Sequence, residues 1–199
     1  MKKRLTIIQM DVHVNDVEYN YTRVQELLSQ SLSENPDIIV LPETWNTGFY
    51  PSKDLINIAD RNGERTKSLL STFAKEHNVN IVGGSVAVAK NDVVFNTSYA
   101  YNREGTLVGE YSKMHGFSPA KEDQYFAGGT HTTHFELDGI PCSTVICYDI
   151  RFPELVRMAA LPNTELLFVP AQWPTMRLRH WQVLNEDRKS TRLNSSHIM

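Results

Sequence analysis

Cys147 lies where an apolar run rich in β-branched residues meets the predicted start of a helix, within the segment Val145–Arg157. Pro153 suits the first helical position, and Glu154 lies where the helix dipole favours negative charge. A strand that turns sharply into a helix presents the residue at its tip to free backbone N–H groups. Because a helix N-terminus favours a thiolate, we expect Cys147 to have a lowered pKa and to act as a nucleophile.

A cysteine nucleophile needs a base and a group that stabilises the developing oxyanion. Pro42-Glu43 follows the apolar run 37–41, which places Glu43 just past a buried strand, where α/β sheets build their sites. Lys113 follows the β-rich run 107–111, and Glu122 lies in a charged loop. Each of these residues alone has a plainer interpretation, as a solvated surface charge or, for Cys147, as a buried inert thiol.

Hydrophobic periodicity predicts the elements that must position these residues. Helical spacing covers 17–33, 64–77 and 152–160, and β-type runs cover 5–10, 37–41, 81–89, 93–101, 107–111 and 165–170. Asp138-Gly139 is a hairpin turn signal between two further strands, 131–137 and 140–147. Helix–strand alternation at both ends with a β-meander between them predicts a mixed α/β sandwich.

The composition is that of one soluble globular domain. The chain has 199 residues, of which 41% are hydrophobic and 22% charged, with a net charge of −3. This balance favours neither a nucleic-acid nor a membrane partner, and no run approaches the roughly 18 apolar residues of a membrane span. Cys142 and Cys147 are expected on opposite faces of one strand, so no disulfide is predicted, which fits a cytoplasmic protein.

The last residues differ in character from the rest. Residues 187–199 have almost no apolar period and resemble the peptide encoded by common sequencing-adapter DNA. We therefore assign 1–186 to one domain and interpret 187–199 as a non-native tail.

Three segments together resemble the signature blocks of the nitrilase superfamily of carbon–nitrogen hydrolases. They are Ile38–Glu43 (IIVLPE), Tyr111–His115 (YSKMH) and Val145–Glu154 (VICYDIRFPE), followed by Ala171–Pro174 and His180-Trp181. The resemblance covers residues 1 to about 186. It implies a four-layer αββα sandwich of two mixed sheets, incomplete at the C-terminus, because family members continue with a further helix and strands.

The resemblance implies a role for each polar residue. Cys147 would be the nucleophile, Glu43 the general base, and Lys113 the oxyanion stabiliser together with the backbone N–H of Tyr148. A second glutamate is expected at Glu122, with Glu136 as a distant competitor. The partners would be a small amide and water, and no cofactor would be needed.

The CYDxRFPE pattern resembles the ω-amidase branch, which hydrolyses the terminal amide of 2-oxo acid amides such as 2-oxoglutaramate. Arg151 is then either the partner of a substrate carboxylate or a member of a structural ion pair with Asp149 or Glu154. The aromatic residues expected in the pocket wall, with plain core positions as the alternative, are Tyr148, Phe117 and Trp173.

The sequence also bears on alternative functions. A metal site is disfavoured, since His131 and His134 would face opposite sides of a strand and no HExxH or CxxC motif occurs. The remaining alternatives are an N-carbamoyl amine or other aliphatic amide hydrolase, and an inert scaffold. The resemblance implies a homodimer for the full-length protein. We expect the 199-residue chain to lack part of that surface and to aggregate.

Overall fold

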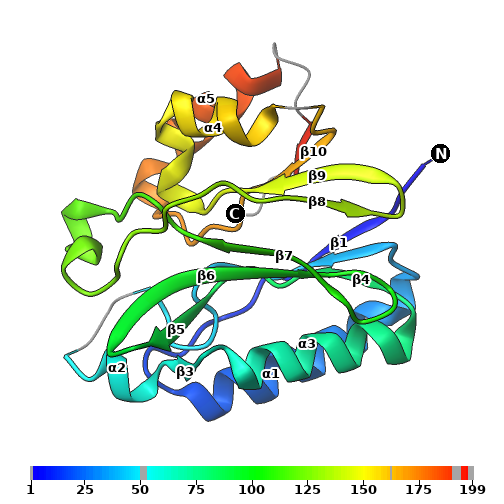
Figure 1. The fold of residues 1–199 in the computed structure, drawn as a ribbon, viewed down its shortest axis with the longest axis horizontal. Helices are drawn as coiled ribbons and strands as arrows, with labels where there is room; N and C mark the ends of the chain where they lie inside the picture. Colours follow the sequence, from blue (N-terminus) through cyan, green and yellow to red (C-terminus); the bar gives the residue numbers. More distant parts are fainter. Residues whose placement is uncertain (1, 50–52, 162, 190–193, 197–199) are drawn as a thin grey trace.

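The computed structural model describes residues 2–49, 53–161, 163–189 and 194–196. Within these ranges the strands form two mixed sheets (Figure 1). The larger sheet contains β1 (Leu5–Ile7), β2 (Ile38–Val40), β3 (Asp60–Arg61), β4 (Asn80–Val82), β5 (Val86–Lys90), β6 (Val93–Tyr101) and β7 (Leu107–Ser112). The smaller sheet contains β8 (His134–Leu137), β9 (Ile140–Thr144), β10 (Leu166–Phe168) and β11 (Asn194–Ser196). The helices are α1 (Val17–Ser31), α2 (Leu55–Ile58), α3 (Glu64–His77), α4 (Pro153–Ala160) and α5 (Leu178–Lys189).

Both sheets combine parallel and antiparallel pairs. In the larger sheet β1, β2 and β4 run parallel, and β6 pairs antiparallel with β4, β5 and β7. In the smaller sheet β9 pairs parallel with β10 and antiparallel with β8. The predicted hairpin is confirmed, because β8 and β9 are joined by Asp138 and Gly139, both with positive φ.

Strand alternation explains the layers. Ile39 and Leu41 belong to the cluster that contains Leu28 of α1 and Leu70 of α3. The neighbouring residues of β2, Ile38 among them, face the other way, into a cluster shared with the smaller sheet. Successive side chains of a strand point to opposite faces, so β2 is buried on both sides.

The smaller sheet is covered in the same way on its outer face. Leu155 and Ala159 of α4 share a cluster with Leu167 of β10 and with Trp181 of α5, whereas Phe168 of β10 faces the larger sheet. Figure 1 shows the resulting order of layers, with α1 and α3 below the two sheets and α4 and α5 above them. The prediction of a four-layer αββα sandwich of two mixed sheets is therefore confirmed.

The predicted strand 81–89 is interrupted, and the interruption shapes the loop that carries Glu43. Gly84 has φ of 60°, and a Cβ there would overlap the carbonyl oxygen of Pro42. Ser85 then donates its N–H to the Pro42 oxygen at 3.0 Å and accepts the N–H of Thr44 at its hydroxyl at 3.0 Å. The break lets β5 support the turn after β2.

The predicted direct passage from strand to helix at Cys147 is wrong in one respect. β9 ends at Thr144, a 3₁₀ turn covers Cys147–Arg151, and α4 begins only at Pro153. Pro153 does occupy the first turn of α4, as predicted. Cys147 therefore lies on a tight turn of its own and not at the N-terminus of a long helix.

Part of the segment interpreted as a non-native tail has regular backbone. α5 extends to Lys189, and Asn194–Ser196 pairs parallel with β10. Residues 190–193 and 197–199 lie outside the described residues, so the domain boundary at 186 stays a prediction. Cys142 and Cys147 are both free and buried, in agreement with the prediction of no disulfide.

Candidate active site

Glu43, Lys113 and Cys147 come together although each follows a different strand. Glu43 and Lys113 are joined by a hydrogen-bonded ion pair of 2.8 Å between Nζ and Oε1. The Cys147 thiol is buried beside them, close enough for the charges of both to act on its pKa. All three residues are buried, with exposed fractions of 0% for Glu43, 3% for Lys113 and 4% for Cys147. A nucleophile, a carboxylate and an ammonium thus share one site shielded from water.

Glu122 completes this cluster. Its carboxylate accepts two hydrogen bonds from Lys113 Nζ, at 2.9 and 2.8 Å, and one from the backbone N–H of Phe117 at 2.7 Å. Glu122 is 1% exposed, whereas its competitor Glu136 is an exposed residue of β8. Of these two glutamates, the structure brings Glu122 to the site.

Burial and opposing charges set the protonation of this cluster. Burial would lower the pKa of Lys113, but the charges of Glu43, Cys147 and Glu122 raise it above its ordinary value. Burial raises the pKa of Glu43, against the lowering effect of Lys113. Lys113 is therefore protonated at neutral pH, and Glu43 is a stronger base than an exposed glutamate.

The expectation of a lowered thiol pKa is wrong. Burial raises the pKa of Cys147 well above that of an ordinary thiol, and the neighbouring charge of Glu43 raises it further. The helix dipole that was expected to lower the pKa belongs to α4, which begins six residues later. Cys147 is thus a neutral thiol at rest and needs a base to become nucleophilic.

The backbone at Cys147 is bent sharply. Cys147 has φ of 48°, in the left-handed region that residues with a side chain seldom adopt and that recurs at functional sites. Its N–H donates to the carbonyl oxygen of Pro170 at 3.0 Å, which ties the turn to the end of β10. The next N–H, of Tyr148, donates to no other residue in the described part of the chain. It is available to a ligand beside the thiol.

Asn96 and Gln172 support the two glutamates, and the sequence alone assigned neither of them a role. Asn96 Nδ2 donates to Glu43 Oε1 and to Glu122 Oε1, at 3.2 Å each. Gln172 donates its N–H to Glu43 Oε2 at 2.8 Å and its side-chain Nε2 to the Glu43 carbonyl at 2.6 Å. An asparagine inside a predicted strand is unusual and was the available signal for Asn96.

Asp149 holds the turn that carries the thiol. Its buried carboxylate accepts hydrogen bonds from the Tyr111 hydroxyl at 2.7 Å, the His115 N–H at 2.9 Å and the Ile146 N–H at 3.1 Å. These contacts link the residue before Cys147 to both sides of Lys113. Asp149 was considered only as a partner of Arg151, and that pairing is not formed among the described residues.

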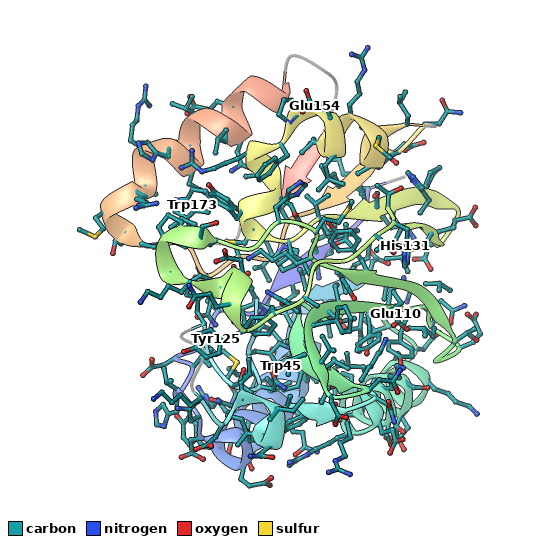
Figure 2. All side chains as sticks on the ribbon, turned by 60° about the vertical axis from the view of Figure 1, so that its left-hand side comes forward. Trp45, Glu110, Tyr125, His131, Glu154 and Trp173 are labelled. Carbon is teal, nitrogen blue, oxygen red and sulfur yellow. The ribbon has the colours of Figure 1, made fainter. Side chains whose placement is uncertain are left out.

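A narrow pocket lies beside Cys147. The predicted wall residues Tyr148, Phe117 and Trp173 all line it, together with Phe49, Gln172, Pro174 and Arg177. Phe117 and Tyr148 make an edge contact with ring centroids 5.0 Å apart. Figure 2 shows Trp173 near the start of α5, beside the green loop that follows β7. Walls of this kind suit a small organic substrate.

Arg151 lies behind this wall and not in it. Its guanidinium is 5.4 Å from the Trp173 ring centroid and 5.7 Å from that of Tyr148, and it donates to His180 Nδ1 at 3.2 Å. Within the described residues it forms no ion pair with Asp149 or Glu154, so the predicted structural pair is absent there. Glu154 lies on the outer side of α4 (Figure 2).

The described residues offer neither a metal site nor a membrane-spanning helix. Within those ranges, no three histidine, cysteine or acidic side chains are grouped so that they could hold a metal ion. No helix in them is both long and apolar enough to cross a membrane.

The chain has relatives of known family. Residues 4–190 match the sequence profile of the carbon–nitrogen hydrolases. A 2-oxoglutaramate amidase of Bacillus subtilis is 40% identical over 184 residues, which are 92% of this chain and 70% of the relative. An omega-amidase of Danio rerio is 30% identical over 200 residues, covering 94% of this chain and 70% of the relative.

A solved structure shares the fold. The crystal structure of XC1258 from Xanthomonas campestris, a CN-hydrolase superfamily protein with an arsenic adduct in its active site, superposes with a TM-score of 0.84. It is 26% identical, and the match covers 97% of this chain and 74% of that one.

Proposed function

Because the chain belongs to the carbon–nitrogen hydrolase family, we propose that it hydrolyses the terminal amide of a small 2-oxo acid amide, with 2-oxoglutaramate as the prime candidate. The products are the carboxylic acid and ammonia. The buried contact of Cys147 with the Glu43–Lys113 ion pair is the observation that carries this proposal. The substrate named for the Bacillus subtilis relative, 2-oxoglutaramate, supports the choice of amide, and the omega-amidase of Danio rerio supports amidase activity.

The first half of the reaction transfers the acyl group to sulfur. Glu43 takes the thiol proton as Cys147 Sγ attacks the amide carbonyl carbon, which gives a tetrahedral intermediate with a negative oxygen. Glu43 then returns that proton to the nitrogen, the carbon–nitrogen bond breaks, and ammonia leaves a thioester on Cys147. The raised pKa of Glu43 suits both the removal and the return of the proton.

The oxyanion is held by two donors. Lys113 is the charged donor, and the N–H of Tyr148 is the neutral one, free of other described acceptors. Donors of this kind lower the barrier by roughly 3–4 kcal/mol each. Glu122 acts through Lys113, because its two hydrogen bonds fix the direction of the ammonium.

The second half of the reaction hydrolyses the thioester. A water enters the place left by ammonia and gives a proton to Glu43 while its oxygen attacks the thioester carbon. The carbon–sulfur bond breaks, Cys147 takes back a proton, and the acid leaves. Glu43 carries each proton of the scheme between the thiol, the leaving nitrogen and the attacking water.

Location and assembly are part of the same proposal. Two buried, unpaired cysteines suit a reducing cytoplasm. A homodimer that uses α4, α5 and the residues next to their ends is supported by apolar side chains exposed there. They are Met158, Leu161, Met176 and Val183.

Ammonia release from 2-oxoglutaramate tests the proposed function. The panel includes butyramide, as a neutral aliphatic amide, and an N-carbamoyl amine. We expect the highest kcat/KM for 2-oxoglutaramate and loss of all turnover in Cys147→Ala. A preference for the N-carbamoyl amine would contradict the substrate assignment, and a chain inactive on every amide would contradict the activity.

A further inference from the structure

Arg177 is the one charged residue among the described residues that line the pocket beside Cys147. The other lining side chains are aromatic or uncharged: Phe49, Phe117, Cys147, Tyr148, Gln172, Trp173 and Pro174. A single cation among low-dielectric walls exerts a strong field, because little water screens it. The pocket lining therefore contains the nucleophilic thiol of Cys147 and one positive charge, the guanidinium of Arg177.

The inner cluster explains why a cation is needed in the pocket. Glu43 and Glu122 surround the single ammonium of Lys113, so with both carboxylates ionised the cluster keeps one uncompensated negative charge. An amide that carries a carboxylate is repelled by that charge. It can present its amide end to Cys147 only if its own charge is neutralised elsewhere in the pocket.

The backbone of Arg177 is fixed at the right place. Arg177 ends the 3₁₀ turn Thr175–Arg177, where its N–H donates to the Pro174 carbonyl at 2.8 Å. Its own carbonyl accepts the indole N–H of Trp173 at 2.9 Å. The guanidinium carbon lies 4.9 Å from the centroid of the Phe117 ring. Both aromatic neighbours of Arg177 are thus pocket walls.

The guanidinium of Arg177 is open to a ligand. It forms no ion pair with an acidic side chain in the described ranges, and its side chain is half-buried. Arg151 differs, since its guanidinium is hydrogen-bonded to His180 behind the rings of Tyr148 and Trp173. Of the two arginines, Arg177 faces the space that a substrate must occupy.

We propose that Arg177 binds the carboxylate of the substrate and so selects anionic amides, with the amide end directed to Cys147. A guanidinium pairs with a carboxylate through two parallel hydrogen bonds, which fixes orientation as well as charge. Arg177 is thus a specificity residue and takes no part in proton transfer. This inference rests on the proposed function for the position of the amide, but it is tested by binding alone.

Binding to the Cys147→Ala protein measures the proposal without turnover. Calorimetry compares two probes, 2-oxoglutaramate as the anionic amide and butyramide as the neutral one. We expect Arg177→Met to lower the affinity ratio of anionic to neutral amide at least tenfold, and Arg177→Lys to restore part of it. Arg179→Met, two residues further on at an exposed position, is the matched control and should leave the ratio within twofold.

Several outcomes would overturn the proposal. The first is an affinity ratio that Arg177→Met leaves unchanged, and the second is an equal loss of affinity for both probes in that variant. The third is a tenfold fall of the ratio in Arg151→Met with no fall in Arg177→Met. The fourth is that the Cys147→Ala protein does not bind the anionic probe. Failure of the proposed function looks different. In that case the wild-type chain releases no ammonia from 2-oxoglutaramate, while the binding ratio still responds to Arg177.

Discussion

The ammonium of Lys113 lies 2.8 Å from the carboxylate of Glu43, and neither side chain is more than 3% exposed. Removing two charges from water costs several kcal/mol for each ion unless partners compensate it. Here the compensation comes from Glu122, Asn96 and Gln172. An arrangement so costly to bury is typical of a site where the charges are used in chemistry.

Lys113→Met should remove both activity and stability. The variant leaves two buried carboxylates without their cation, and breaking a buried pair costs about 3–5 kcal/mol of unfolding free energy. Denaturant titration measures that loss, and we expect ammonia release to fall at least 100-fold. Lys75→Met, on the exposed side of α3, is the control and should change stability by less than about 0.5 kcal/mol. Unchanged stability in Lys113→Met would contradict the buried pair.

Glu122→Gln should lower kcat at least 100-fold with a smaller effect on KM. The amide keeps the size of the side chain but no longer holds the ammonium of Lys113 with two charged acceptors. Glu136→Gln makes the same chemical change on the exposed face of β8 and should keep kcat within twofold. Steady-state kinetics of both variants shows which glutamate acts in catalysis. Equal changes in kcat for the two variants would contradict the role of Glu122.

Asn96→Ala should move the acid limb of the pH profile of kcat/KM to higher pH. Asn96 donates to Glu43 and Glu122, and these hydrogen bonds favour the ionised carboxylates. The wild-type limb should already lie at higher pH than for an exposed glutamate, because burial raises the pKa of Glu43. Loss of a charge-assisted bond of about 1.5 kcal/mol corresponds to roughly one further pH unit. A limb that stays in place or moves to lower pH would contradict the role of Asn96.

Glu43→Gln should abolish hydrolysis and at the same time make Cys147 easier to alkylate. The charge of Glu43 raises the pKa of the thiol, so its removal lowers the pH at which iodoacetamide reacts. Peptide mass spectrometry across pH follows Cys147 separately from Cys142, whose pKa burial raises to about 12. We expect hydrolysis to fall by about 10²–10⁴-fold. A thiol less reactive than in the wild type, or a variant that keeps the wild-type rate of hydrolysis, would show that Glu43 is not the base.

The sequence predicted the elements well where one local pattern determined them. The helix at 64–77 and the strand at 93–101 have the predicted bounds, because periodicity and turn residues delimit both. The strand 81–89 was broken by Gly84, whose positive φ depends on a contact with Pro42 that is distant in sequence. A tertiary contact of this kind leaves no local signal.

The site residues, too, were predicted where a local pattern marks them and missed where only tertiary contacts do. Glu43, Lys113 and Cys147 were found because each lies within three residues of the end of a strand and because their motifs resemble those of one family. Asn96 and Arg177 were missed, since a buried amide and a pocket arginine are recognised only by what surrounds them. The thiol pKa was predicted in the wrong direction, because burial outweighs a helix dipole that begins at Pro153.

The identity of the covalent intermediate tests the central claim most directly. Wild-type protein mixed with 2-oxoglutaramate and quenched in acid within the first turnover is digested and analysed by mass spectrometry. We predict an acyl group on the peptide that contains Cys147, none on Cys142, and an ammonia burst equal to the amount of acylated protein. Steady ammonia release with Cys147 unmodified at every quench time, and undiminished in Cys147→Ala, would contradict the account.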